Sequence, residues 1–195
     1  MFHEIPKSIQ DRMAFLEAID RRDRADGTGR LQRLRQIPPE TGKFLALLAA
    51  NAPKGGFVEI GTSAGYSALW LSLALREGEK LTTFEIMPEK IMLARETFWL
   101  CNMEERIDLV EGDLLDNADA LCDVSFCFID CEKHLYERCF AVMADKMAPG
   151  GLIVADNATN HYECIRPMIA LAVNDKRFDC VTVPIGKGEF VCRRK

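Results

Sequence analysis

The sequence lacks several features that identify other classes of protein. No apolar segment approaches the roughly 20 residues of a membrane-spanning helix, and charged residues occupy the first positions, where a secretion signal needs an apolar stretch. The formal net charge is -5 over 195 residues, whereas binding to phosphate groups needs clustered basic side chains. We therefore expect a cytoplasmic protein without a nucleic-acid or membrane partner. The arginines of the single basic stretch are predicted to form a solvated face: Arg21, Arg22, Arg24, Arg30, Arg33 and Arg35.

Cysteine pairs with the spacing of a zinc site are also missing. None of the eight cysteines are arranged as Cys-x-x-Cys, and a chain of this length with 48% hydrophobic residues can bury a full core without disulfides. Several cysteines lie inside apolar segments. We predict reduced, buried thiols in one compact domain: Cys101, Cys122, Cys127, Cys131, Cys139, Cys164, Cys180 and Cys192.

Residues 57–71 are the central segment of the chain, with the sequence Phe-Val-Glu-Ile-Gly-Thr-Ser-Ala-Gly-Tyr-Ser-Ala-Leu-Trp-Leu. The apolar residues around Glu59 predict a strand, Gly61 and Gly65 a turn, and the following apolar residues recur at helical spacing. Glycines allow a backbone to approach a ligand closely, and the helix that follows offers unpaired N–H groups. The three-glycine dinucleotide motif is not met, so a purely structural strand-to-helix turn remains an alternative for this segment alone.

The rest of the chain alternates predicted helices and strands, which is typical of a doubly wound parallel sheet. Further strands are predicted at 81–84, 107–110, 124–129 and 152–155, and a closing hairpin, which adds an antiparallel strand, at 180–184 and 189–192. Helices are predicted at 9–19, 43–51, 88–100, 135–147 and 162–174, with a polar linker after the first and an Ala-Pro-Gly-Gly turn at 148–151. We expect one α/β domain over 1–195, in which helices of residues 1–52 pack on a cofactor-binding core of residues 53–195.

Acidic residues follow almost every predicted strand, at the edge where such sheets bind ligands. Each one alone is explained by helix capping, but gathered carboxylates repel one another unless a cation or a hydroxyl-rich ligand satisfies them. Glu85 lies 24 residues after Gly61, which is the distance at which an acidic side chain reaches ribose, so we expect an adenosine-containing ligand. The set comprises Glu59, Glu85, Asp113, Asp130, Asp156 and Asn157.

Three of these residues predict a metal site. Asp130, Asp156 and Asn157 offer only oxygen ligands, which favours Mg²⁺, with Ca²⁺ or Mn²⁺ as alternatives, over zinc. Lys133 follows Asp130 by three residues. A lysine next to a metal can accept a proton at a depressed pKa, although spacing alone is equally compatible with a solvated lysine.

Five motifs in this order resemble the cation-dependent, S-adenosylmethionine-dependent O-methyltransferases, which include catechol and caffeoyl-CoA O-methyltransferases. The similarity extends from about Gln36 to the end of the chain. It implies a Rossmann-like class I methyltransferase fold, with a seven-stranded sheet whose last strand is antiparallel, and a homodimer. The motifs are Glu-Ile-Gly-Thr-Ser-Ala-Gly-Tyr-Ser (59–67), Phe-Glu-Ile-Met-Pro-Glu (84–89), Val-Glu-Gly-Asp (110–113), Phe-Ile-Asp-Cys-Glu-Lys (128–133) and Ala-Pro-Gly-Gly-Leu-Ile-Val-Ala-Asp-Asn (148–157).

The resemblance also implies a role for each matching residue. Lys133 would be the catalytic base, and Asp130, Asp156 and Asn157 the metal ligands. Methyl transfer to a hydroxyl of a small phenolic or catechol-like acceptor is the implied reaction. The cofactor contacts would be Glu59, Gly61, Thr62, Ser67, Glu85, Asp113, Leu114 and Asp130.

One departure from the family concerns the acceptor. The family usually carries an insertion after the Asp-Asn pair, whereas this chain continues through Ala-Thr-Asn-His directly into its last predicted helix. The acceptor therefore stays open at this point. A nicotinamide-dependent oxidoreductase is one alternative, but it would not need the Asp130, Asp156 and Asn157 set. A methyltransferase acting on RNA or protein is the nearer alternative, although the acidic composition and Ala-Asp-Asn in place of an Asn-Pro-Pro-Tyr-type amine site count against it.

Overall fold

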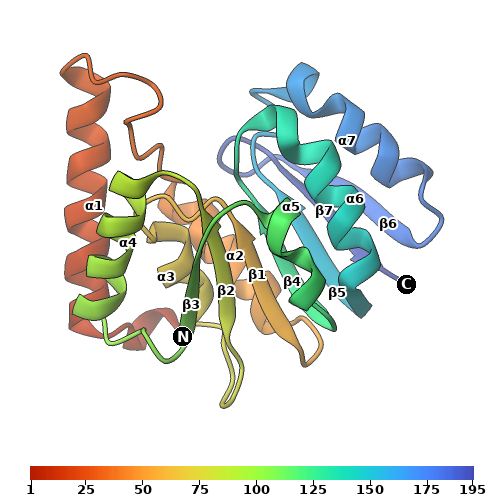
Figure 1. The fold of residues 1–195 in the computed structure, drawn as a ribbon, viewed down its shortest axis with the longest axis horizontal. Helices are drawn as coiled ribbons and strands as arrows, with labels where there is room; N and C mark the ends of the chain where they lie inside the picture. Colours follow the sequence, from red (N-terminus) through yellow and green to blue (C-terminus); the bar gives the residue numbers. More distant parts are fainter.

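A seven-stranded sheet lies at the centre of the computed structural model, which describes residues 1–195 (Figure 1). The strand order is β3-β2-β1-β4-β5-β7-β6. Strands β1 to β5 pair in parallel, and β7 is antiparallel to both of its neighbours. The predicted doubly wound sheet with an antiparallel last strand is therefore confirmed. The strands are β1 Gly56–Ile60, β2 Leu81–Glu85, β3 Ile107–Glu111, β4 Val124–Ile129, β5 Met147–Ala155, β6 Phe178–Val183 and β7 Glu189–Arg194.

Helices cover both faces of this sheet (Figure 1). Helices α1 to α4 share one buried apolar cluster with the sheet, and α5 to α7 share the other. No helix is long and apolar enough to cross a membrane. The helices are α1 Lys7–Ala25, α2 Pro39–Ala50, α3 Tyr66–Ser72, α4 Pro88–Leu100, α5 Leu114–Asn117, α6 Tyr136–Lys146 and α7 Tyr162–Asn174, with 3-10 turns at Phe2–Glu4, Ala118–Ala120 and Lys133–Leu135.

Strand β4 shows why this sheet is buried on both faces. All six of its residues are buried. Phe126 and Phe128 belong to the cluster under α1 to α4, whereas Cys127 and Ile129 belong to the cluster under α6 and α7. Successive side chains of a strand point to opposite faces, so a continuous apolar run suits a central parallel strand. Burial of one such phenylalanine stabilises the fold by about 1.5–3 kcal/mol.

The first helix extends further than the sequence indicated. It continues to Ala25, so the first part of the predicted polar linker is helical. Arg24 donates to Asp20 at 2.7 Å, one helical turn away, and such i,i+4 ion pairs stabilise a helix. Helix α2 begins earlier than predicted because Pro39 occupies its first turn.

The predicted turn at 148–151 lies within β5. Met147 pairs with Val124 and Leu152 pairs with Phe126, so β5 uses five residues where β4 uses two, and the strand bulges. Gly150 has a φ of 80° at this bulge. Composition could not distinguish a bulge from a chain reversal, because both favour glycine.

All eight cysteines are free, as predicted, but they are not all buried. Cys122 and Cys164 are exposed, and Cys131 and Cys180 are half-buried. Cys122 lies in the loop before β4 and Cys164 on α7, outside the sheet. The prediction of a buried thiol was therefore wrong for these two exposed residues.

Candidate active site

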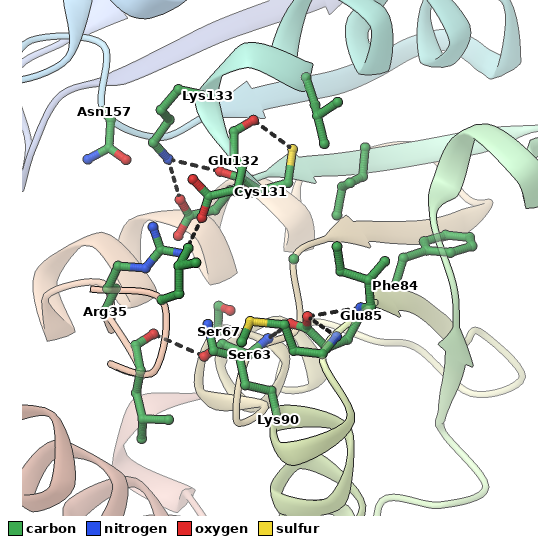
Figure 2. A pocket seen from close by; sticks show the side chains of 18 of the residues that line it. Arg35, Ser63, Ser67, Phe84, Glu85, Lys90, Cys131, Glu132, Lys133 and Asn157 are labelled. Atoms are coloured by element: carbon green, nitrogen blue, oxygen red, sulfur yellow. Dashed lines mark hydrogen bonds and ion pairs between the residues drawn. The ribbon is translucent and has the colours of Figure 1, made fainter. Parts of the chain in front are cut away.

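A cavity of about 450 Å³ lies at the carboxyl ends of the strands. Ile60 of β1, Glu85 of β2 and Asp130 after β4 line it. In the sheet order, β1 is the strand at which the connections change direction, and open α/β sheets bind ligands at that switch point. Figure 2 shows Glu85, Ser63 and Lys90 toward one end of the cavity, and Arg35, Glu132, Lys133 and Asn157 toward the other.

The two glycines of the turn after β1 occupy positions that exclude a side chain. Gly61 has a φ of 105°, and a Cβ there would lie 2.6 Å from the Asp130 carbonyl oxygen. Gly65 has a φ of 86°, and a Cβ there would lie 2.7 Å from the Phe98 ring. Only glycine adopts this conformation without steric cost. The turn is therefore fixed against β4 on one side and α4 on the other, and Gly61 leaves its backbone open to the cavity.

Glu85 is held rigidly at the end of β2. Its Oε2 accepts a hydrogen bond from the Ser63 N–H at 2.8 Å, and its Oε1 accepts from the N–H groups of Ile86 and Met87 at 2.9 and 3.0 Å. Its side chain lines the cavity and is 7% exposed. A carboxylate has about four acceptor positions, so about one remains for a hydroxyl group of a ligand.

Glu59 and Thr62 lie beneath the cavity wall, not in it. The Thr83 hydroxyl is 2.6 Å from both Glu59 Oε2 and the Thr62 hydroxyl, and Glu59 is fully buried. Ser67 lines the cavity. Burial raises the pKa of Glu59 to about 7, although the nearby hydroxyls of Ser67 and Thr83 oppose this shift. Any influence of Glu59 and Thr62 on a ligand therefore passes through neighbouring side chains.

Asp113 has the capping role that is common for an aspartate at a helix start. Its Oδ1 accepts a hydrogen bond from the Leu115 N–H at 3.0 Å and so caps the start of helix α5. The sequence did not predict this short helix. Asp113 and its neighbour Leu114 also line the cavity. Capping and ligand contact are thus compatible at this position.

Lys133 lies at the other end of the cavity, beside Asp130. Its ammonium group donates to Asp130 Oδ1 at 2.8 Å, to the Tyr136 hydroxyl at 2.6 Å and to the Cys131 carbonyl at 3.3 Å. Its side chain is only 11% exposed. All three protons of the ammonium have acceptors, so the interpretation of Lys133 as a solvated surface residue is excluded.

The end of β5 lies beside the end of β4, as predicted, because the Asp156 N–H donates to the Ile129 carbonyl at 3.1 Å. Asp156 is fully buried, however, and does not line the cavity. The expectation that this carboxylate sits on an open rim was wrong. Asn157 does line the cavity, and its Nδ2 donates to Asn160 at 3.0 Å.

The sequence did not indicate that Glu189 would lie beside Asp156 at the end of β5. The start of β7 lies opposite the end of β5, and the buried Glu189 carboxyl contacts Asp156. Burial and the charge of Asp156 raise the pKa of Glu189 to about 10, while burial and the charge of Asp130 raise the pKa of Asp156 to about 6. A glutamate before an apolar strand gives no sign of such a contact.

The oxygen atoms available here suit a hard cation, but they do not form a finished cluster. No three His, Cys, Asp or Glu side chains converge as a metal site. Asp156 Oδ2 and both carboxylate oxygens of Glu189 are buried without a hydrogen-bond donor. Such atoms are costly to bury unless a proton or a cation satisfies them. These oxygen atoms are therefore of the chemical type that binds a divalent cation.

Loops distant in the sequence form the mouth of the cavity beside Lys133. The short segment after Asn157 is attached to the loop between β6 and β7, because the N–H groups of Ala158 and Thr159 donate to Gly188 and Lys187 at 2.8 and 3.1 Å. The basic stretch contributes too, since the residues Arg24, Arg30 and Arg35 line the cavity. Arg24 and Arg30 are exposed, as predicted for a solvated face, whereas Arg35 is half-buried and departs from that prediction.

The sheet order, the glycine turn at the switch point and the fixed acid after β2 define a Rossmann-like α/β enzyme. The model of the O-methyltransferase family matches residues 21–195, and this chain belongs to that family. A protein of Mycobacterium sp. (strain JLS) is 31% identical over 173 residues, which are 81% of this chain and 79% of that protein. A catechol O-methyltransferase of Niastella koreensis is 32% identical over 126 residues, 62% of this chain and 57% of that protein.

Solved structures of O-methyltransferases share the fold. The O-methyltransferase of Bacillus cereus in complex with SAH superposes with a TM-score of 0.82 at 22% identity and covers 98% of this chain and 93% of its own. TomG of Streptomyces achromogenes, in complex with SAM, gives a TM-score of 0.77 at 20% identity and covers 92% of this chain and 89% of its own. The Rossmann-like methyltransferase fold implied by the sequence motifs is confirmed.

Proposed function

We propose that this protein transfers the methyl group of S-adenosylmethionine to a hydroxyl group of a small phenolic, catechol-like acceptor. The observation that carries the proposal is that one cavity of a family member holds a fixed acid beside a glycine turn at one end and Lys133 with Asp130 at the other. The names of the Bacillus cereus, Streptomyces achromogenes and Niastella koreensis proteins support the cofactor and the acceptor class. Membership of the family decides against the nicotinamide-dependent alternative.

The end of the cavity beside Glu85 suits the nucleoside. The remaining lone pair of Glu85 can accept a hydrogen bond from a ribose hydroxyl, and the bare backbone of Gly61 permits close approach. Phe84 and Leu114 supply apolar surface in the same wall for a purine ring. S-adenosylmethionine supplies an activated methyl group on its sulfonium sulfur.

The reaction is a single displacement in which a C–O bond forms as the S–C bond breaks. Alignment of the two reactants is worth up to about 7–11 kcal/mol in favourable cases. Lys133 first releases one ammonium proton to solvent and then accepts the proton of the acceptor hydroxyl, so its ammonium form is restored. The three oxygen atoms around the Lys133 nitrogen then stabilise the ammonium group that this transfer creates.

A divalent cation would be held by Asp130, Asp156 and Asn157, and Mg²⁺ is the ion that this all-oxygen donor set favours. Such an ion would lower the pKa of an acceptor hydroxyl, as it does for bound water. The orphaned Oδ2 of Asp156 supports this part of the proposal. Asp130 also contacts Lys133, so the same carboxylate would orient the proton acceptor.

The test is incubation with S-adenosylmethionine and catechol, with Mg²⁺ or with excess EDTA, followed by mass spectrometry of the methylated product. We expect product with Mg²⁺ and little in the chelator. Full turnover in excess EDTA would contradict the role of the cation. Glu85→Ala should abolish most binding of the demethylated cofactor in calorimetry, whereas Glu111→Ala, at the exposed end of the adjacent strand, should not. Equal binding by the two variants would overturn the ribose assignment.

A further inference from the structure

The cavity mouth beside Lys133 carries positive charges that the proposed reaction does not use. Arg30 and Arg35, from the loop after α1, and Lys187, from the loop between β6 and β7, all line it. The charges of these side chains all affect the pKa of the same imidazole, that of His161. The pKa of His161, which lines the same mouth, is lowered first by burial and then by the positive charges of Lys133, Arg30, Lys187 and Arg35.

Two of these cations have no direct hydrogen bond to a carboxylate. The only hydrogen-bond acceptor for the Lys187 ammonium is the Gln36 carbonyl, at 3.5 Å. Arg30 approaches Glu132 only at 3.7 Å, whereas Arg35 donates to the same carboxylate at 2.5 Å. Glu132 is therefore already satisfied by Arg35, and the N–H groups of Arg30 and Lys187 are available to a ligand.

The nearby acidic groups do not cancel the positive charge. Asp130 offsets Lys133, and the single carboxylate of Glu132 is shared between Arg35 and, at 3.7 Å, Arg30, so these two acids face three cations. Asp156 and Glu189 are buried behind the wall, where the charge of Lys187 opposes the rise of both pKa values, and the hydrogen bond of the Lys187 ammonium goes to the Gln36 carbonyl instead. In a chain with a net charge of -5, this mouth is locally basic, and a basic, partly enclosed site attracts anionic ligands.

We propose that the acceptor carries a carboxylate on its ring in addition to the hydroxyl that is methylated, and that Arg30 and Lys187 bind this carboxylate. The inference rests on the proposed function, because it places the acceptor beside Lys133. A charge-assisted hydrogen bond to a carboxylate is about twice as strong as a neutral one. The two cations would thus select acidic phenols over neutral phenols of the same shape.

The test compares 3,4-dihydroxybenzoate with 3,4-dihydroxybenzamide, which has nearly the same shape without the charge. Binding of each is measured by calorimetry to enzyme saturated with S-adenosylhomocysteine, and kcat/KM is measured with S-adenosylmethionine. We expect the carboxylate to be preferred by tenfold or more in both measurements, mainly through KM in the kinetics. The preference should weaken as salt concentration rises, because salt screens partly exposed charges.

Substitution of single residues tests which side chains cause the preference for the carboxylate. Lys187→Gln and Arg30→Gln should each reduce the preference for the carboxylate by about tenfold, on the scale of one hydrogen bond to a charged group. Lys176→Gln makes the same change of charge at an exposed residue outside the cavity and should leave the preference intact. Equal binding of the two acceptors, or no binding of either, would overturn the inference. Neutral catechols would still be methylated in the first case, so the proposed function is tested separately.

Discussion

Replacement of Glu59 by glutamine should make the protein more stable, by an amount that grows as pH rises from about 4.5 to 7. Glu59 is fully buried under the glycine turn, where its Oε2 accepts from Thr83 and its Oε1 has no partner. Burial raises the pKa of this carboxyl from 4.5 to about 7. One pKa unit corresponds to 1.36 kcal/mol, so ionised Glu59 costs the folded state on the order of 3 kcal/mol.

The direction of the pH dependence of stability follows from how tightly the folded and unfolded states hold the proton of Glu59. The folded state holds the proton of Glu59 more tightly than the unfolded chain, so this contribution to stability is fully present below about pH 4.5 and is lost as pH rises through about 7. Glutamine resembles the protonated carboxyl and does not ionise. The stability of Glu59→Gln relative to the parent should therefore rise from near zero at pH 4.5 to about 3 kcal/mol at pH 8.

The assay is urea unfolding of both proteins, followed by circular dichroism, at several values between pH 4.5 and 8. The difference between the two proteins isolates Glu59, because other buried acids titrate in both. Glu137→Gln, at an exposed position of α6, should show no difference that depends on pH. A constant difference between Glu59→Gln and the parent across this range would refute the reasoning.

Three further predictions concern other parts of the site. Lys133→Ala should lower kcat by about 100-fold or more, the usual scale for a general base, with little change in cofactor affinity, and an unaltered pH–rate profile would contradict the role. Gly61→Ala should destabilise the fold by about 1–3 kcal/mol and weaken cofactor binding, because its Cβ would lie 2.6 Å from a carbonyl oxygen. Gly56→Ala is the matched control, since a Cβ there meets nothing within 4 Å. Equal urea midpoints for the two variants would contradict the prediction. Glu189→Gln should change the stability of the cation-free protein little at neutral pH, because the pKa of Glu189 is raised to about 10 and glutamine resembles the protonated carboxyl that contacts Asp156; a loss of more than about 1 kcal/mol in urea would contradict the protonated state.

The sequence was sufficient to place groups that lie at the ends of neighbouring strands. Asp130 and Asp156 could be predicted to be adjacent because parallel strands end at one edge, and they are. The left-handed turn at Gly61 could be predicted because few residues other than glycine adopt it. Both features could be predicted because they depend on local conformation and on the alternation of strands and helices, which leave recognisable patterns in the sequence.

Contacts between distant loops could not be predicted in the same way. Arg30 and Lys187 are 157 positions apart, and nothing in the spacing of either residue indicates a common cavity. The burial of Asp156 depends on Glu189 and the antiparallel pairing of β7, which the strand pattern gives without its register. Bulges and loop packing arise from tertiary contacts, and these contacts leave no periodic signal in the sequence.

The insertion of β7 between β5 and β6 has a consequence for synthesis of the protein on the ribosome. The nucleoside end of the cavity uses residues up to Asp130, against which the Gly61 turn packs, whereas the mouth near Lys133 needs Lys187 and the backbone that holds Ala158 and Thr159. These parts emerge last. A nascent chain can therefore form the nucleoside end first, but it gains a complete acceptor end only when the C-terminal hairpin has joined the sheet.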